Sequence, residues 1–297
     1  MPSVRRLTRL AQDRLPDRVT DSARHLATGW GRLTASARLK PTFLVVGAQR
    51  CGTTTLYRML SEHPQVVRPT TSKGIGYFDL EYTRSFGWYR GHFPIEALAR
   101  RRTAPAPPVT FESSGYYCYH PIAADRIARD LPGVKAVMLV RDPVERAWSA
   151  YKHETARGFE SETFERALEL EAVRLVGEEE RLAADPAYRG EHHRHHSYLA
   201  RGHYADQLER LQGALGAENV FVMDAGRLFL DPGAEFTALT DWLGLTRFVP
   251  EEIEQWNARP GDLDPALRLE LTEHFEPYDT RLAEMVGWVP SWRKPID

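Results

Sequence analysis

The chain has 297 residues, 42% of them apolar, which is enough to bury one large α/β core. Its formal net charge of −2 argues against a general nucleic-acid-binding protein, since such domains are usually basic. Cys51 and Cys118 are the only cysteines, and the sequence has no secretory signal and no apolar run long enough to cross a membrane. We therefore expect a soluble, cytoplasmic protein in a reducing compartment.

A basic extension comes first. Residues 1–40 contain nine Lys and Arg against three Asp, and leucines recur at roughly helical intervals. Such a segment is either a packing arm or partly ordered tail, or an amphipathic helix that makes peripheral contact with a membrane surface or a partner. Bulky apolar anchors are missing before Trp30, which favours the first interpretation. We expect the folded domain to occupy residues 41–297.

The next stretch has the pattern of a phosphate-binding strand, loop and helix. The apolar run 43–46 predicts a strand buried on both faces. Gly47 and Gly52 have the spacing of a P-loop, in which backbone N–H groups and the N-terminus of the next helix converge on an anion. The alternative is an ordinary tight turn without a ligand. If the loop binds phosphate, its contacts come from Arg50, Cys51, Gly52, Thr53, Thr54 and Thr55.

This loop departs from the ATP-binding version of the P-loop. That version has a Lys after the second Gly, which reaches the β- and γ-phosphates, and then a hydroxyl that holds Mg²⁺. Here Thr53 stands in place of the Lys, and the nearest cation is Arg50, inside the loop. The loop therefore suits a shorter nucleotide, and we expect no metal. The histidine-rich run 191–196 lacks a carboxylate or Cys at a spacing that would close a metal site.

Strands and helices alternate along the rest of the chain. Strand patterns occur at 65–67, 109–112, 134–140 and 219–223, and helical patterns at 122–131, 163–182, 204–215, 236–243 and 265–286, with Pro277 restarting the last of these. Such alternation predicts a parallel sheet with helices on both faces. We therefore predict an α/β protein with a P-loop-like three-layer α/β/α fold and a mostly parallel central sheet.

A second anion site is predicted where the strand 134–140 ends. Arg141 follows this strand, Asp142 is a good N-cap and Pro143 is a good first helical residue. Arg141 is thus held at the carboxyl end of a strand, where open α/β sheets bind ligands, and Ser149 follows two turns into the helix. A cation and a hydroxyl in these positions suit a phosphate. The alternative is a local Arg–Asp ion pair.

Together, these motifs resemble the sulfotransferase family, and most closely its bacterial and heparan-sulfate-type branch, over residues 41–292. These enzymes move a sulfuryl group from 3′-phosphoadenosine 5′-phosphosulfate (PAPS) to an acceptor hydroxyl or amine and release 3′-phosphoadenosine 5′-phosphate (PAP). The resemblance implies that residues 47–55 hold the 5′-phosphosulfate. It also implies that Arg141 and Ser149 bind the 3′-phosphate and that Arg259 belongs to the same nucleotide site. The domain after the extension would then be a sulfotransferase domain.

The resemblance also implies catalytic roles. Arg50 stands where the family often has Lys, so it would stabilise the charge that develops on the leaving group. Relatives carry a general base, Glu or His, in the segment that matches 73–79, but this chain has Gly74 and Gly76 there. His153 lies in a stretch where many relatives have a His, and it is therefore the first candidate for the base.

Behind His153 stand Glu112 and His120 as candidate bases. Relatives often place a Lys directly after the Glu, whereas Ser113 follows Glu112 here. Either the acceptor is an easy nucleophile, or another residue has taken over, or activity is reduced. Three hypotheses follow. The first is a PAPS-dependent sulfotransferase that acts on a carbohydrate, a glycolipid or a small metabolite. The others are a PAPS- or PAP-binding protein of the same fold with reduced or lost transfer activity, and a P-loop kinase.

Overall fold

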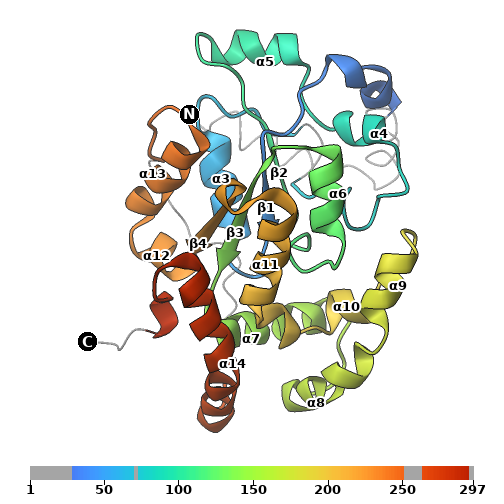
Figure 1. Ribbon diagram of the computed structural model, residues 1–297, viewed down its shortest axis with the longest axis vertical. Helices are drawn as coiled ribbons and strands as arrows, with labels where there is room; N and C mark the ends of the chain where they lie inside the picture. The colour runs from blue at the N-terminus through green and yellow to red at the C-terminus, as the bar shows by residue number, and fades with distance from the viewer. Residues whose placement is uncertain (1–28, 70–72, 251–262, 294–297) are drawn as a thin grey trace, which may run out of the picture.

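The computed structural model describes residues 29–69, 73–250 and 263–293 (Figure 1). Most of the predicted extension and the predicted nucleotide contact Arg259 lie outside the described residues. Within the described ranges no helix is long and apolar enough to cross a membrane.

A four-stranded sheet, parallel throughout, forms the centre of the molecule, with strand order β2-β1-β3-β4. Its strands are β1 (Phe43–Gly47), β2 (Phe111–Ser113), β3 (Lys135–Val140) and β4 (Val220–Asp224). All five residues of β1 are buried, as the apolar run predicts. Because β1 lies between β2 and β3, the loop that follows it opens next to the carboxyl ends of both neighbours. The predicted α/β class and parallel sheet are confirmed.

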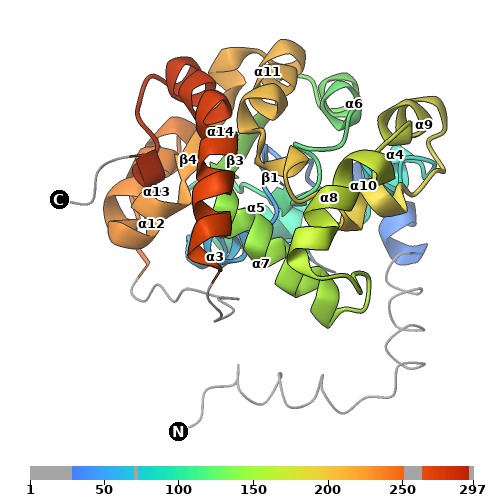
Figure 2. The same cartoon turned by 90° about the horizontal axis from the view of Figure 1, so that it is seen from below.

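Helices cover both faces of this sheet. In Figure 2, α6 (Ala123–Asp130) and α11 (Tyr204–Leu215) lie on one face, and α3 (Thr53–Glu62) lies on the other. Each strand is joined to the next by a crossover connection that contains at least one helix, as parallel strands require. The other described elements are η1 (Ala35–Ala37), α4 (Phe86–Arg90), α5 (Glu96–Thr103), α7 (Pro143–Ala156), α8 (Phe164–Arg174), α9 (Glu178–Ala184), α10 (Glu191–His195), η2 (Ala200–Gly202), η3 (Ala217–Asn219), α12 (Ala225–Leu230), α13 (Pro232–Leu243), α14 (Pro265–Val286) and η4 (Ser291–Arg293).

Two of the predicted elements are wrong in extent. The strand expected at 65–67 is a single bridge between Val66 and Val109, because the neighbouring prolines cannot donate to a longer ladder. The single helix expected over 163–182 is two helices, because Gly177 adopts a left-handed conformation (φ 72°) and begins α9.

Pro277 does not restart the last helix, since α14 runs through it. Proline removes the hydrogen bond to the carbonyl of Glu273, but both residues are exposed, so water can reach that carbonyl. The short helix α12 between β4 and α13 was not predicted from the sequence. It begins where the Asp224 carboxylate caps two backbone N–H groups.

Residues just before the predicted domain start lie against α4. The backbone N–H of Leu39 donates to the Pro94 carbonyl (2.9 Å), and the Arg38 guanidinium donates to the Phe93 carbonyl (2.5 Å). Gly31 approaches Gly91 so closely that a Cβ on Gly31 would lie 2.5 Å from the Gly91 carbonyl oxygen. The described part of the basic segment is therefore packed on the domain.

A buried carboxylate fixes the segment that connects α3 to α4. Glu112, the middle residue of β2, is 0% exposed. Its Oε1 accepts from the Ile75 and Gly76 N–H groups (both 3.1 Å) and from the Ser114 and Tyr117 hydroxyls (both 2.7 Å). Its Oε2 accepts from the Tyr89 hydroxyl (2.7 Å). Burial raises the pKa of Glu112, and the five hydrogen bonds oppose that rise.

We expect Glu112→Ala to destabilise the fold strongly, because it leaves five buried donors without an acceptor. Each such donor typically costs ~1–3 kcal/mol, so a loss of at least about 3 kcal/mol is expected in urea unfolding. Glu112→Gln keeps one oxygen and should cost less. Glu276→Ala, on an exposed position of α14, is the control and should change stability by less than about 0.5 kcal/mol. Equal unfolding midpoints for Glu112→Ala and the control would contradict the role of Glu112.

Candidate nucleotide-binding site

The loop between β1 and α3 has two positions that only glycine can occupy. Gly52 has φ 86°, and a Cβ there would lie 3.1 Å from the Phe229 ring. A Cβ on Gly47 would lie 2.3 Å from Cys118 Sγ. Both glycines therefore hold the loop tightly against its surroundings. The first N–H groups of α3 point out of the helix at this end, where they suit an anion.

Arg50 joins this loop to the second predicted anion site. Its backbone has φ 72°, which is uncommon for a residue with a side chain. Its Nε donates to Ser149 Oγ (3.0 Å), and its carbonyl accepts from the Arg141 guanidinium (3.4 Å). Residues from the loop, the end of β3 and α7 are thus brought together. Their role toward a nucleotide stays a prediction.

Arg141 is placed by the start of α7. Asp142 caps this helix, since its carboxylate accepts from the Val144 and Glu145 N–H groups (2.9 and 3.4 Å), and Pro143 is the first helical residue. Arg141 pairs with Glu145 (3.4 Å) one turn on, and the two side chains are 31% and 34% exposed. The Arg–Asp pair considered from the sequence is therefore an Arg–Glu pair. Pairs this exposed are weak, so a phosphate can replace the carboxylate.

Sequence reasoning missed Lys73. Its Nζ donates to Thr54 Oγ1 (2.9 Å) and Thr53 Oγ1 (3.2 Å), in the first turn of α3. Burial, together with the nearby charge of Arg58, lowers the pKa of Lys73 to about 8. A signal was available, because the loop lacks the Lys of the ATP-binding version and Lys73 stands beside the unusual Gly74. The distance along the chain between Lys73 and the loop gave no reason to expect a contact between them.

A polar network behind the loop was also missed. Gln49 Nε2 donates to Glu154 Oε1 (3.4 Å), and Gln49 Oε1 accepts from the Arg201 guanidinium. His195 Nδ1 lies 2.9 Å from Glu154 Oε2, and its ring stacks on Phe159. Burial opposes ionisation of Glu154, but the hydrogen bond and charge of His195 prevail, and the pKa of Glu154 is lowered. The histidine-rich run thus supports the loop, and no group of three or more metal-ligating side chains occurs among the residues described.

The three candidate bases have different surroundings. His153 is half-buried on α7, one turn beyond Ser149, and its charge helps to lower the pKa of Glu154. Glu112 is occupied by five donors, so it serves the fold. His120 is buried, and burial together with Arg126 lowers its pKa to about 3. The surroundings of Glu112 and His120 thus count against these two, and the role of His153 stays a prediction.

The two unusual glycines differ in the room around them. Gly76 has φ 72°, and a Cβ there would lie 3.0 Å from Asp79 Oδ1, so a side chain at this position is strained and crowded. Gly74 lies outside the left-handed region, and its Cβ would lie 3.5 Å from the Ser113 carbonyl and 3.6 Å from Ser114 Oγ, which are ordinary contacts. Only Gly74 can accept a side chain without a change of backbone. Asp79 is buried, and burial raises its pKa to about 7.

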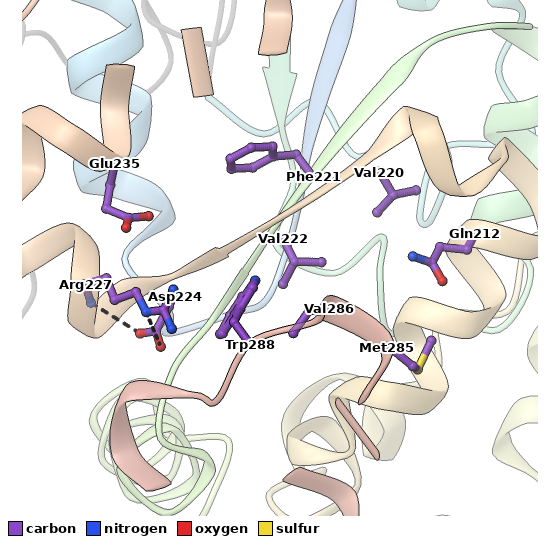
Figure 3. A pocket seen from close by; sticks show the side chains of 10 residues that line it. All are labelled: Gln212, Val220, Phe221, Val222, Asp224, Arg227, Glu235, Met285, Val286 and Trp288. Atoms are coloured by element: carbon purple, nitrogen blue, oxygen red, sulfur yellow. Dashed lines mark hydrogen bonds and ion pairs between the residues drawn. The ribbon is translucent and has the colours of Figure 1, made fainter. Parts of the chain in front are cut away.

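A separate pocket of about 310 Å³ lies along the edge strand β4 (Figure 3). Val220, Phe221 and Val222 of β4 line it, together with Met285 and Val286 at the end of α14. None of the predicted site residues lines this pocket. The pocket and the candidate nucleotide site are therefore different places.

Comparisons with known proteins agree with the expected family. A family model described as the sulfotransferase domain matches residues 40–258. The chain is 26% identical over 296 residues to bifunctional heparan sulfate N-deacetylase/N-sulfotransferase 2 of Bos taurus, and the aligned region covers 89% of this chain and 32% of that protein. It is 28% identical over 222 residues to bifunctional heparan sulfate N-deacetylase/N-sulfotransferase of Drosophila melanogaster, and here the aligned region covers 71% of this chain and 20% of that protein.

The chain thus spans a third or less of the length of these curated relatives. Among solved structures, the crystal structure of a sulfotransferase from Alicyclobacillus acidocaldarius is similar with a TM-score of 0.62 and 29% identity. The match covers 86% of this chain and 100% of that one. The family model alone matches well over half of the sequence. The chain therefore belongs to the sulfotransferase domain family.

Proposed function

We propose that the chain transfers a sulfuryl group from PAPS to a hydroxyl or amine of a carbohydrate, glycolipid or small-metabolite acceptor. The observation that carries this proposal is the 3.0 Å hydrogen bond from Arg50 to Ser149, because it brings residues of the two predicted anion sites together. PAPS has two separate anionic groups, a 5′-phosphosulfate and a 3′-phosphate. The loop 47–55 would take the first, and Arg141 with Ser149 the second.

The residues at this site suit transfer by in-line displacement. Such a reaction depends on positioning and on donors that face the leaving oxygen. In this proposal, Arg50 and the N–H groups at the start of α3 supply such donors to the 5′-group. The acceptor must also lose a proton, and His153 is our candidate for the base.

Two alternative functions remain to be compared with this proposal. A P-loop kinase would need a Lys at Thr53 and a metal at Thr54, whereas the Thr54 hydroxyl already accepts from Lys73. A nucleotide-binding protein with reduced transfer activity would explain Gly74 and Gly76. Incubation with labelled PAPS and a panel of acceptors tests the proposal, since label on an acceptor supports transfer. Binding of PAP without any labelled product would favour the binding protein.

Arg141→Ala should weaken PAP binding tenfold or more, because a hydrogen bond to a charged group is worth ~1.5–3 kcal/mol. Adenosine 5′-phosphosulfate lacks the 3′-phosphate, so its affinity should hardly change. Titration calorimetry with both nucleotides makes the comparison, and Arg100→Ala on the exposed face of α5 is the control. Similar losses for the two nucleotides would show that Arg141 does not bind the 3′-phosphate.

Arg50→Ala should lower turnover by more than it lowers PAPS affinity, because we expect Arg50 to act mainly on the transition state. Arg50→Lys should keep part of the activity, since it preserves a cation at the same place. Steady-state kinetics at saturating PAPS measure this difference. Turnover at the native rate in saturated Arg50→Ala would leave Arg50 with a binding role only.

His153→Ala should lower turnover on the order of 10²-fold and leave PAP affinity nearly unchanged. The native rate should rise with pH over the range in which a histidine loses its proton, and the variant should lack that rise. Gly74→Glu in the His153→Ala background should restore part of the rate, because a side chain fits at Gly74. The same replacement at Gly76 should not. An unchanged pH profile in His153→Ala would rule out this histidine as the base.

A further inference from the structure

The Lys73 ammonium contacts the hydroxyl that corresponds in the motif to the metal ligand of the ATP-binding loop. In that version the hydroxyl at the position of Thr54 is a ligand of Mg²⁺, and the preceding Lys touches the outer phosphates. Here Nζ of Lys73 is 2.9 Å from Thr54 Oγ1 and 3.2 Å from Thr53 Oγ1. One ammonium therefore reaches both positions from a different segment of the chain.

We propose that Lys73 replaces the magnesium ion of the ATP-binding loop and binds the 5′-anionic group of the nucleotide. This inference rests on the proposed function, because it uses the same nucleotide. It gives a nucleotide-binding role to a residue that the sequence analysis did not place in the site. It also gives a physical reason for the loop to work without a metal.

The main chain explains how Lys73 reaches the loop. The Ser113 N–H donates to the Lys73 carbonyl (3.3 Å), and Glu112 holds the N–H groups of Ile75 and Gly76. Lys73 and the residues that follow it are thus tied to β2.

The charges around Lys73 favour an anionic ligand. Arg58 on α3 is the nearby charge that acts on Lys73, and it is a cation. The Glu112 carboxylate on β2 is occupied by its five donors. Across residues 29–69, 73–250 and 263–293, no carboxylate forms an ion pair with Lys73. Its charge is therefore left for a ligand to neutralise.

The sign of the pH dependence follows from this burial. Burial and Arg58 lower the pKa of Lys73 to about 8, so below that pH the amine is already charged and binding needs no proton. Above it, the free amine is largely neutral and must gain a proton when the anion binds. Affinity should then fall as pH rises above about 8, by up to about tenfold per pH unit, until the pKa of the complex is reached.

Titration calorimetry with PAP tests the inference. Its phosphates are already ionised above about pH 7, so they do not contribute protons. We expect the native protein to bind with similar affinity in EDTA and in Mg²⁺. At about pH 9 it should take up a measurable fraction of a proton, as read from buffers of different ionisation enthalpy. At about pH 7 the uptake should be close to zero.

Two variants and a control separate the possible causes. Lys73→Arg keeps a permanent charge, so it should bind PAP without proton uptake and with affinity independent of pH. Lys73→Met should bind at least about tenfold more weakly at pH 7, since a charged hydrogen bond is lost. Lys135→Met removes a half-buried lysine whose Nζ donates to the Trp242 carbonyl, away from the loop, and should behave like the native protein.

The outcomes distinguish this inference from the proposed function. PAP binding without proton uptake at about pH 9, or with unchanged uptake in Lys73→Arg, would overturn the role of Lys73 and leave the nucleotide assignment intact. An absolute need for Mg²⁺ would also overturn it. No PAP binding at any pH would overturn both proposals together.

Discussion

The buried Glu112 carboxylate decides how the site is assembled. It accepts hydrogen bonds from the N–H groups of Ile75 and Gly76, and this fixes the backbone path of the segment that carries Lys73. A carboxylate with no exposure is stable only when donors saturate it, and five do so here. The position of the Lys73 ammonium and the course of the backbone at Gly74 both follow from this anchor.

Features encoded within a few residues could be predicted from the sequence. The run 43–46 and the glycine spacing after it predicted β1, the loop and α3, because a buried strand needs apolar residues and a tight turn needs glycine at particular positions. Arg141, Asp142 and Pro143 predicted the start of α7 for the same reason, and the cap is present. The alternation of strands and helices was enough for the α/β class and the parallel sheet.

Features that depend on segments far apart in the chain could not be predicted. Lys73 meets Thr53 and Thr54 only because β2 pairs with β1 and holds the intervening segment in place. The contact between Gln49 and Glu154 depends in the same way on β3 lying next to β1. The sequence showed that Gly74 and Gly76 lack the side chains of the family pattern. Only the backbone angles show that a side chain would be strained at Gly76 and not at Gly74.

The exposed pair between Arg141 and Glu145 has a consequence for behaviour in salt. Glu145 also binds Arg268 of α14, so this carboxylate holds two guanidinium groups at the edge of the site. Added ions screen the pair and release Arg141, while they also screen its attraction for a phosphate. These two effects have opposite signs. Nucleotide affinity should therefore vary less with ionic strength than the number of cations around the loop suggests.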